Sequence, residues 1–295
     1  MSKFFPKLLL ILAAFLAGSF FSRYRASTQV ASRVSPTSSP VSVAQINQLK
    51  IQVLPPQGFT FDIAWGDLGQ RLVKIGVIDR AKFDKLFAGQ PDLVKKYLDG
   101  SDETSITITA DSAQFWVDLL WAAGLAQKSP VLDSGPMQAS GDPGRFASTG
   151  GWTLGKKSAM TYYSQSQLIP LTPDQHERVK SIAENIYRPC CGNSTAFPDC
   201  NHGMAALGLV ELMVSQGASD DQIYRTILAF NSFWFPQTYL ELGYHFSKSG
   251  TSWDRVDPKL ALGKSFSSGP GYSAVKRQIG TVPGLNDAGG GGCGV

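Results

Sequence analysis

Three of the chain's four cysteines and one of its three histidines lie in one short segment, residues 188–204. The cysteines are Cys190, Cys191 and Cys200, and the histidine is His202. Thiolates are nucleophiles and soft metal ligands, and imidazole is both a base and a ligand. These four residues are therefore our candidate catalytic residues and our candidate metal ligands.

Thiol–disulfide exchange is the first chemistry that this segment predicts. Cys200 precedes a predicted helix, whose N-terminal N–H groups and dipole stabilise a thiolate. Cys190 or Cys191 would be the resolving partner, and His202 would add charge or act as a base. Because neighbouring cysteines rarely bridge each other without strain, the thiols of Cys190 and Cys191 are expected to face different partners.

Metal binding by soft ligands is the second chemistry that this segment predicts. Cys190, Cys191, Cys200 and His202 form a Cys₃His set. Zinc sites commonly draw their ligands from Cys-x-x-Cys pairs, and that spacing is missing here. Monovalent copper accepts cysteine and histidine with fewer geometric demands, so copper suits the set better than zinc.

The fourth cysteine, Cys293, lies in a glycine-rich C-terminus. A flexible arm of ten residues spans roughly 17 Å, enough to carry a thiol to and from the loop. A structural alternative stays open, in which the cysteines form disulfide staples and the protein is a binding module. A hydrolase built on Cys200 and His202 is disfavoured, because the two lie too close in sequence for a typical nucleophile and base.

The N-terminus predicts a signal peptide or membrane anchor over residues 1–25. Lys3 and Lys7 precede the uncharged apolar run 8–21, which is shorter than the roughly 20 residues of a full membrane span. A flexible linker is expected over residues 26–56. The body of the protein is then extracytoplasmic, either secreted or attached to a membrane through its N-terminus.

The charge of +4 depends on the N-terminal segment. Residues 1–41 contain five basic residues and no acidic one, so the rest has 27 − 5 = 22 basic and 23 acidic residues, a net charge of −1. No stripe of Lys and Arg remains, and we do not expect nucleic-acid binding.

Apolar periodicity predicts a mainly α-helical body in two parts. A helical unit over residues 57–160 has helices at 67–75, after Asp79, at 92–98 and through 115–125, a short strand at 105–109 and a long loop rich in Gly, Ser and Pro. A bundle of three to four helices over residues 161–250 carries the cysteine loop. The capping sequences Thr172–Gln175 and Ser219–Gln222 begin two of its helices. Residues 251–295 are expected to form an extended tail.

The order of elements over residues 174–236 resembles the CcmH/CycL family, the periplasmic thiol-redox subunits of cytochrome c maturation. Against that family's motif, roughly Leu-Arg-Cys-Pro-x-Cys-x-Asn-x-Ser, Cys191 falls on the second cysteine and Asn193 keeps the asparagine. Residues 216–223 match the family's Gly-x-Ser-Asp-x-x-Ile turn. The resemblance implies a membrane-anchored three-helix bundle whose redox motif lies between its first two helices. Arg188 stands where the family has its first cysteine, which argues against a simple Cys-x-x-Cys mechanism.

The leading interpretation is thus an exported thiol–disulfide redox protein, active in cytochrome c or metalloprotein maturation. Its partner would be a protein thiol or disulfide, or a metal-carrying protein. The open alternatives are a copper or zinc protein and a disulfide-stapled binding module.

Overall fold

The computed structural model describes residues 42–101, 104–282 and 284–285. The predicted signal or anchor at 1–25 lies outside these residues, as do the first part of the predicted linker and Cys293. No helix in the described part of the chain is both long enough and apolar enough to cross a membrane.

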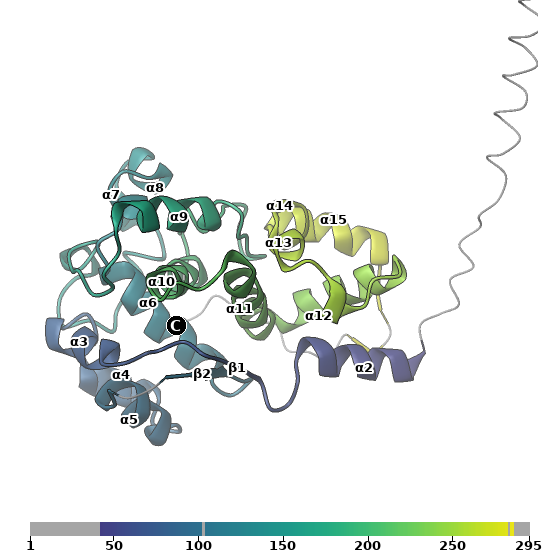
Figure 1. The fold of residues 1–295 in the computed structure, drawn as a ribbon, viewed down its shortest axis with the longest axis horizontal. Helices are drawn as coiled ribbons and strands as arrows, with labels where there is room; N and C mark the ends of the chain where they lie inside the picture. The colour runs from purple at the N-terminus through teal and green to yellow at the C-terminus, as the bar shows by residue number, and fades with distance from the viewer. Residues whose placement is uncertain (1–41, 102–103, 283, 286–295) are drawn as a thin grey trace, which may run out of the picture. The chain divides into compact units, whose positions relative to one another are not determined.

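The described residues are mainly helical, as predicted (Figure 1). The α-helices are α2 (Val43–Val53), α3 (Leu68–Ile75), α4 (Arg80–Leu86), α5 (Pro91–Asp99), α6 (Ala113–Ala126), α7 (Pro130–Asp133), α8 (Pro136–Ala139), α9 (Pro173–Ala183), α10 (Asn201–Ser215), α11 (Asp220–Trp234), α12 (Pro236–Lys248), α13 (Pro258–Leu262), α14 (Lys264–Ser267) and α15 (Gly269–Ile279). Short 3₁₀ turns lie at Pro143–Arg145, Ala159–Thr161 and Trp253–Arg255.

The helix that starts at the cysteine loop, α10, packs on α6, α9 and α11 (Figure 1). Its contact with α6 is close because two glycines face each other. A Cβ atom on Gly124 would lie 2.2 Å from the carbonyl oxygen of Met204, and one on Gly208 would lie 2.8 Å from the backbone nitrogen of Gly124. Since α6 comes from the predicted 57–160 unit and α10 from the predicted 161–250 bundle, the two share one core. The described residues form one compact unit.

A two-stranded antiparallel sheet pairs β1 (Phe59–Phe61) with β2 (Ile106–Ile108). The sequence predicts β2 through its alternating Ile and Thr, whereas β1, which has the same length, was not predicted. Phe61 lies against Phe230 of α11, with ring centroids 6.2 Å apart, so the sheet covers part of the helical core.

The predicted helix starts in the bundle are confirmed at both capping boxes, at Thr172 and at Ser219. However, α9 ends already at Ala183. Tyr187 instead forms a β-bridge with Ser194 and donates its backbone N–H to the carbonyl of Leu262. The chain therefore leaves the helix before it reaches the cysteines.

The prediction of a flexible linker over 26–56 is wrong for residues 43–53, which form α2. Ser42 and Gln45 cap this helix reciprocally, and Ile46, Leu49 and Val53 are buried along one face. The helix packs on α12. The Ser- and Pro-rich composition that indicates a linker stops just before this apolar spacing begins.

The prediction of an extended tail over 251–295 is also wrong for its first part, which contains α13, α14 and α15. Asp257 and Ser268 cap the first and the last of these helices through their side-chain oxygens. Leu262 and Val275 are buried. Helices α13 and α14 are too short to give a clear apolar period, and α15 has Val275 as its buried residue, so contacts with α11 and α12 stabilise these helices.

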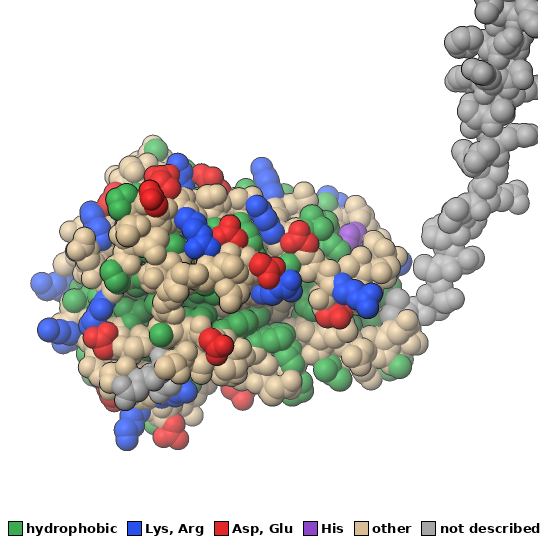
Figure 2. Space-filling model, viewed as in Figure 1, with side chains coloured by type: hydrophobic (Ala, Val, Ile, Leu, Met, Phe, Trp, Pro, Cys, Tyr) green, Lys and Arg blue, Asp and Glu red, His purple; other side chains and the backbone are tan. Residues whose placement is uncertain are grey.

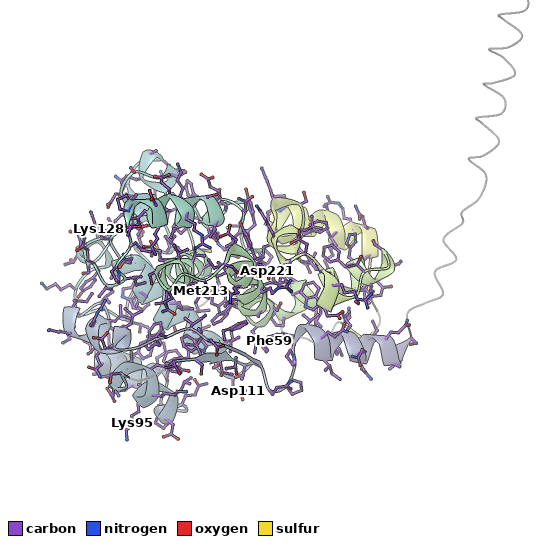
Figure 3. All side chains as sticks on the ribbon, viewed as in Figure 1. Phe59, Lys95, Asp111, Lys128, Met213 and Asp221 are labelled. Atoms are coloured by element: carbon purple, nitrogen blue, oxygen red, sulfur yellow. The ribbon has the colours of Figure 1, made fainter. Side chains whose placement is uncertain are left out.

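Charged side chains of both signs are interspersed on the face shown in Figure 2. Figure 3 contrasts Met213 of α10, which lies in the interior, with Lys95 of α5, which lies at the edge. The interior is thus formed around α10, the helix that begins at the candidate site.

Candidate functional site

Cys200 is the N-cap residue of α10. Its backbone is extended, and its Sγ atom accepts a hydrogen bond from the backbone N–H of Gly203 at 3.4 Å. A serine or aspartate would normally fill this role. The sulfur therefore lies where the unpaired N–H groups and dipole of α10 favour negative charge.

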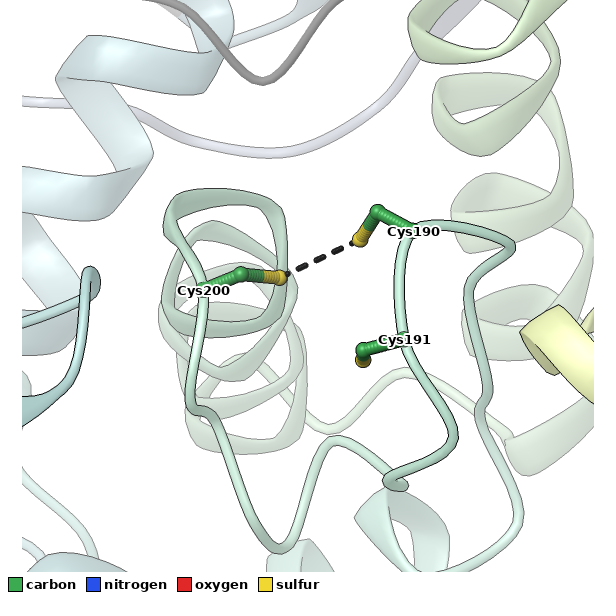
Figure 4. Close-up of side chains that lie close together, drawn as sticks. All are labelled: Cys190, Cys191 and Cys200. Atoms are coloured by element: carbon green, nitrogen blue, oxygen red, sulfur yellow. Dashed lines mark hydrogen bonds between the residues drawn. The ribbon is translucent and has the colours of Figure 1, made fainter.

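The three sequence-predicted thiols meet at this helix start (Figure 4). The Sγ atoms of Cys190 and Cys200 are 3.3 Å apart, and the Sγ atoms of all three cysteines lie within 4.8 Å of one another. Cys191 also directs its Sγ toward the carbonyl of Asn193 at 3.8 Å. We call Cys190, Cys191 and Cys200 the thiol cluster.

A buried guanidinium lies against the thiol cluster. Arg188 is only 1% exposed, and its Nε donates to the Sγ of Cys200 at 2.9 Å. Its other nitrogens donate to Asp199 at 2.6 Å and to the carbonyls of Asn193 and Phe197, each at 3.2 Å. Asp199 in turn accepts from the side-chain amide of Asn193 at 2.7 Å. Arg188 therefore connects the cysteine loop to the start of α10.

Gly203 leaves the space that this guanidinium occupies. A Cβ atom at Gly203 would lie 2.4 Å from Cζ of Arg188 and 2.5 to 2.7 Å from two of its nitrogens. Any other residue would displace the guanidinium from the sulfur, so Gly203 belongs to the site although it bears no functional group.

The surroundings of Cys200 and Cys191 shift the pKa values of these two thiols in opposite directions. Hydrogen bonds with Cys190 and Cys191 lower the pKa of Cys200 well below its usual value, with help from the charges of Arg188 and His202 and against the effect of burial. At Cys191 the hydrogen bond with Cys190 lowers the pKa, but the hydrogen bond with Cys200 and burial outweigh it and raise the pKa to about 11. The cluster thus favours one thiolate, on Cys200.

His202 is close to the cluster but packs differently from the prediction. Its ring packs against Phe235 in a tilted and against Trp234 in an edge-on arrangement, with centroids 4.5 and 5.6 Å apart. Among the described residues, the atoms that lie close enough together to share one metal ion are the three sulfurs, and His202 is not among them. Of the predicted Cys₃His set, the structure assembles the three thiols.

The C-terminal helices hold the cysteine loop from the other side. The backbone N–H of Gly269 donates to the carbonyl of Cys191 at 2.7 Å, and that of Tyr187 donates to Leu262 at 2.8 Å. The loop that carries Cys190 and Cys191 is therefore held from two sides. Arg188 ties it to the start of α10, and Gly269 ties it to the start of α15.

Sequence reasoning does not identify Arg188, Asp199 and Gly203 as parts of the site. In the sequence, Arg188 is noticed only as a departure from a cysteine motif. The signal that could identify the pair is that Arg188 and Asp199 lie on either side of Cys190 and Cys191, since an Arg and an Asp so placed can pair across a short loop.

No protein-family model, curated protein or solved structure matches this chain. The function of this chain is therefore inferred from the chemistry of the thiol cluster and its surroundings.

Proposed function

We propose that this protein is an extracytoplasmic thiol–disulfide oxidoreductase that exchanges a disulfide between Cys190 and Cys200 with a partner protein. The observation that carries the proposal is the 3.3 Å separation of these two sulfurs beside the guanidinium of Arg188. A disulfide bond is about 2.05 Å long, so a small movement of the Cys190 side chain would form it.

The exchange proceeds in two steps. The Cys200 thiolate attacks one sulfur of a partner disulfide, which forms a mixed disulfide and releases one partner thiolate. Cys190 then loses its proton and attacks the Sγ of Cys200, which forms the Cys190–Cys200 disulfide and releases the second partner thiolate. Two electrons pass from this protein to its partner, and the reverse sequence transfers the disulfide outward.

The surroundings of Cys200 favour the reduced form. Arg188 and the start of α10 stabilise the thiolate, and this stabilisation is lost once the sulfur enters a neutral disulfide. Proteins whose reduced form is stabilised are strong oxidants. We therefore assign this protein the role of disulfide donor.

Two further properties belong to this proposal. The resemblance of residues 174–236 to the CcmH/CycL family supports a place in cytochrome c or metalloprotein maturation. The basic and apolar N-terminus supports export and attachment to a membrane. The helical frame around the cysteine loop agrees with the family's helix–loop–helix order.

Redox titration of the full chain in glutathione buffers, followed by mass spectrometry of the trapped thiols, tests the proposal. We expect one reversible disulfide, which Cys190→Ser and Cys200→Ser abolish and Cys191→Ser and Cys293→Ser retain. A bridge that resists reduction until the protein unfolds would instead establish the structural staple. A bridge that needs Cys293 would reject the Cys190–Cys200 assignment.

A further inference from the structure

The three sulfurs of the thiol cluster have the spacing of a metal site. Metal–sulfur bonds of about 2.3 Å place the sulfurs of a three- or four-coordinate ion roughly 3.8 to 4.0 Å apart. The closest pair here is at 3.3 Å, and all three sulfurs are within 4.8 Å of one another. Small side-chain movements would bring them to equal distances around one ion.

We propose that the reduced protein binds one monovalent copper ion, coordinated by the thiolates of Cys190, Cys191 and Cys200 alone. The site uses the same thiols as the proposed exchange, but it is a separate activity and includes Cys191, which the exchange does not use.

The residues around the cluster select the metal. Zinc takes four ligands in structural sites, whereas monovalent copper is satisfied by soft thiolates in lower coordination. No fourth ligand atom of a described His, Cys, Asp or Glu joins the three sulfurs. The Asp199 carboxylate is engaged by Arg188 and Asn193, and His202 packs on aromatic rings. The donor set therefore fits a three-coordinate copper ion and leaves zinc one ligand short.

Fixed positive charge offsets part of the charge of the complex. Three thiolates and one Cu⁺ ion carry a net charge of −2, and each thiol that is still protonated releases its proton on binding. Arg188 donates directly to one of the sulfurs, and the N-terminus of α10 adds a partial positive charge beside it. Because Arg188 is also paired with Asp199, the site keeps a net negative charge when copper is bound.

Copper binding and disulfide formation exclude each other. The Cys190–Cys200 disulfide would remove two of the three ligands, so only the reduced protein holds the ion. Bound copper in turn keeps both thiols from partner disulfides. Oxidation of the cluster would release the metal.

The test is an anaerobic titration of the reduced full chain with Cu⁺, in competition with the chromophoric chelator bathocuproine disulfonate. We expect one ion per chain, with X-ray absorption showing three sulfur neighbours at about 2.3 Å. Cys190→Ser, Cys191→Ser and Cys200→Ser should each weaken binding by at least 100-fold, whereas Cys293→Ser should leave it unchanged. Circular dichroism of each variant verifies that it is folded.

Several results would overturn the copper site. They are two sulfur neighbours instead of three, unchanged affinity in Cys191→Ser, dependence on Cys293, or zinc binding of equal strength. Cys191→Ser also separates the two proposals, because it should lose copper and keep the reversible disulfide. In the parent chain, absence of copper binding with intact exchange rejects only the metal site, and absence of exchange with intact copper binding rejects only the oxidoreductase.

Discussion

Arg188 contributes to both folding and chemistry through one side chain. It is nearly fully buried, and its charge is balanced by Asp199 and by the sulfur of Cys200. Removing one partner from a buried ion pair typically costs about 3–5 kcal/mol. The same contact that stabilises the loop thus stabilises a thiolate, and substitutions here are expected to affect stability and reactivity together.

Replacing Arg188 by glutamine should raise the pKa of Cys200, because the thiolate loses its closest counter-ion. With the other two thiols replaced by serine for the measurement, Asp199 and His202 are the titratable groups left around the sulfur, and Asp199 without its partner adds to the rise. The measurement is thiolate absorbance at 240 nm against pH in a Cys190→Ser, Cys191→Ser background.

Arg178→Gln is the matched control for this prediction. Arg178 pairs with Asp220 at the start of α11 and makes no contact with the cluster. Arg188→Lys keeps the charge but loses several hydrogen bonds of the guanidinium. It should therefore keep part of the lowering of the Cys200 pKa that Arg188→Gln removes. An unchanged titration in Arg188→Gln would show that the guanidinium does not act on Cys200.

Gly203→Ala should produce a similar shift without removing any charge. The added methyl group would overlap the guanidinium, so Arg188 must move away from the sulfur. Overpacking of this kind costs about 1–3 kcal/mol of stability. Gly192→Ala is a suitable control in the same loop, because a Cβ there meets only Pro270 at 3.9 Å. Equal thiolate titrations for the two variants would contradict the proposed role of Gly203.

At the scale of the element, α10 combines a reactive start with a buried acid. Glu211 is fully buried in this helix, and burial raises its pKa to about 8, partly offset by the hydroxyl of Ser129. A carboxyl group with a raised pKa binds its proton more tightly in the folded state. Stability is therefore greatest below the unfolded pKa, near 4.5, and falls as pH rises toward 8.

Glu211→Gln should remove this pH dependence. At pH 9 the variant should be more stable than the parent protein by on the order of 3 kcal/mol, since glutamine needs no proton to stay neutral. Urea unfolding at pH 5, 7 and 9 measures the effect. Glu177→Gln, on the exposed face of α9, should change nothing. If the parent and Glu211→Gln lose the same free energy of unfolding as the pH rises, the pH dependence comes from groups other than Glu211.

The elements also show how far the sequence predicts this fold. Helices with a polar cap and a clear apolar period were predictable, as at Ser219, and so was the position of the cysteine loop between two helices. Short elements such as β1 and α13 were not, because packing against distant segments stabilises them. The residues of the candidate site were also predictable only in part. The cysteines were recognisable by type, whereas the contact of Arg188 with Cys200 depends on the folded loop.

At the scale of the whole molecule, α2 attaches the first described residues to the core by packing on α12. A chain truncated before Gln57 should have a markedly lower thermal unfolding temperature than a chain truncated before Ser42. The shorter chain loses Ile46, Leu49 and Val53, and each buried aliphatic side chain contributes about 1.5–3 kcal/mol. Calorimetry of both chains measures the difference, and equal unfolding temperatures would show that α2 adds no stability.

The hydrogen bonds from Tyr187 to Leu262 and from Gly269 to Cys191 also set an order of events in time. A ribosome adds about 5–20 residues per second, so the cysteine pair leaves it several seconds before the segment that anchors it. During that interval the thiols have no fixed geometry and are open to mispairing. Any factor that shields nascent thiols would therefore act on this protein before its last helices are made.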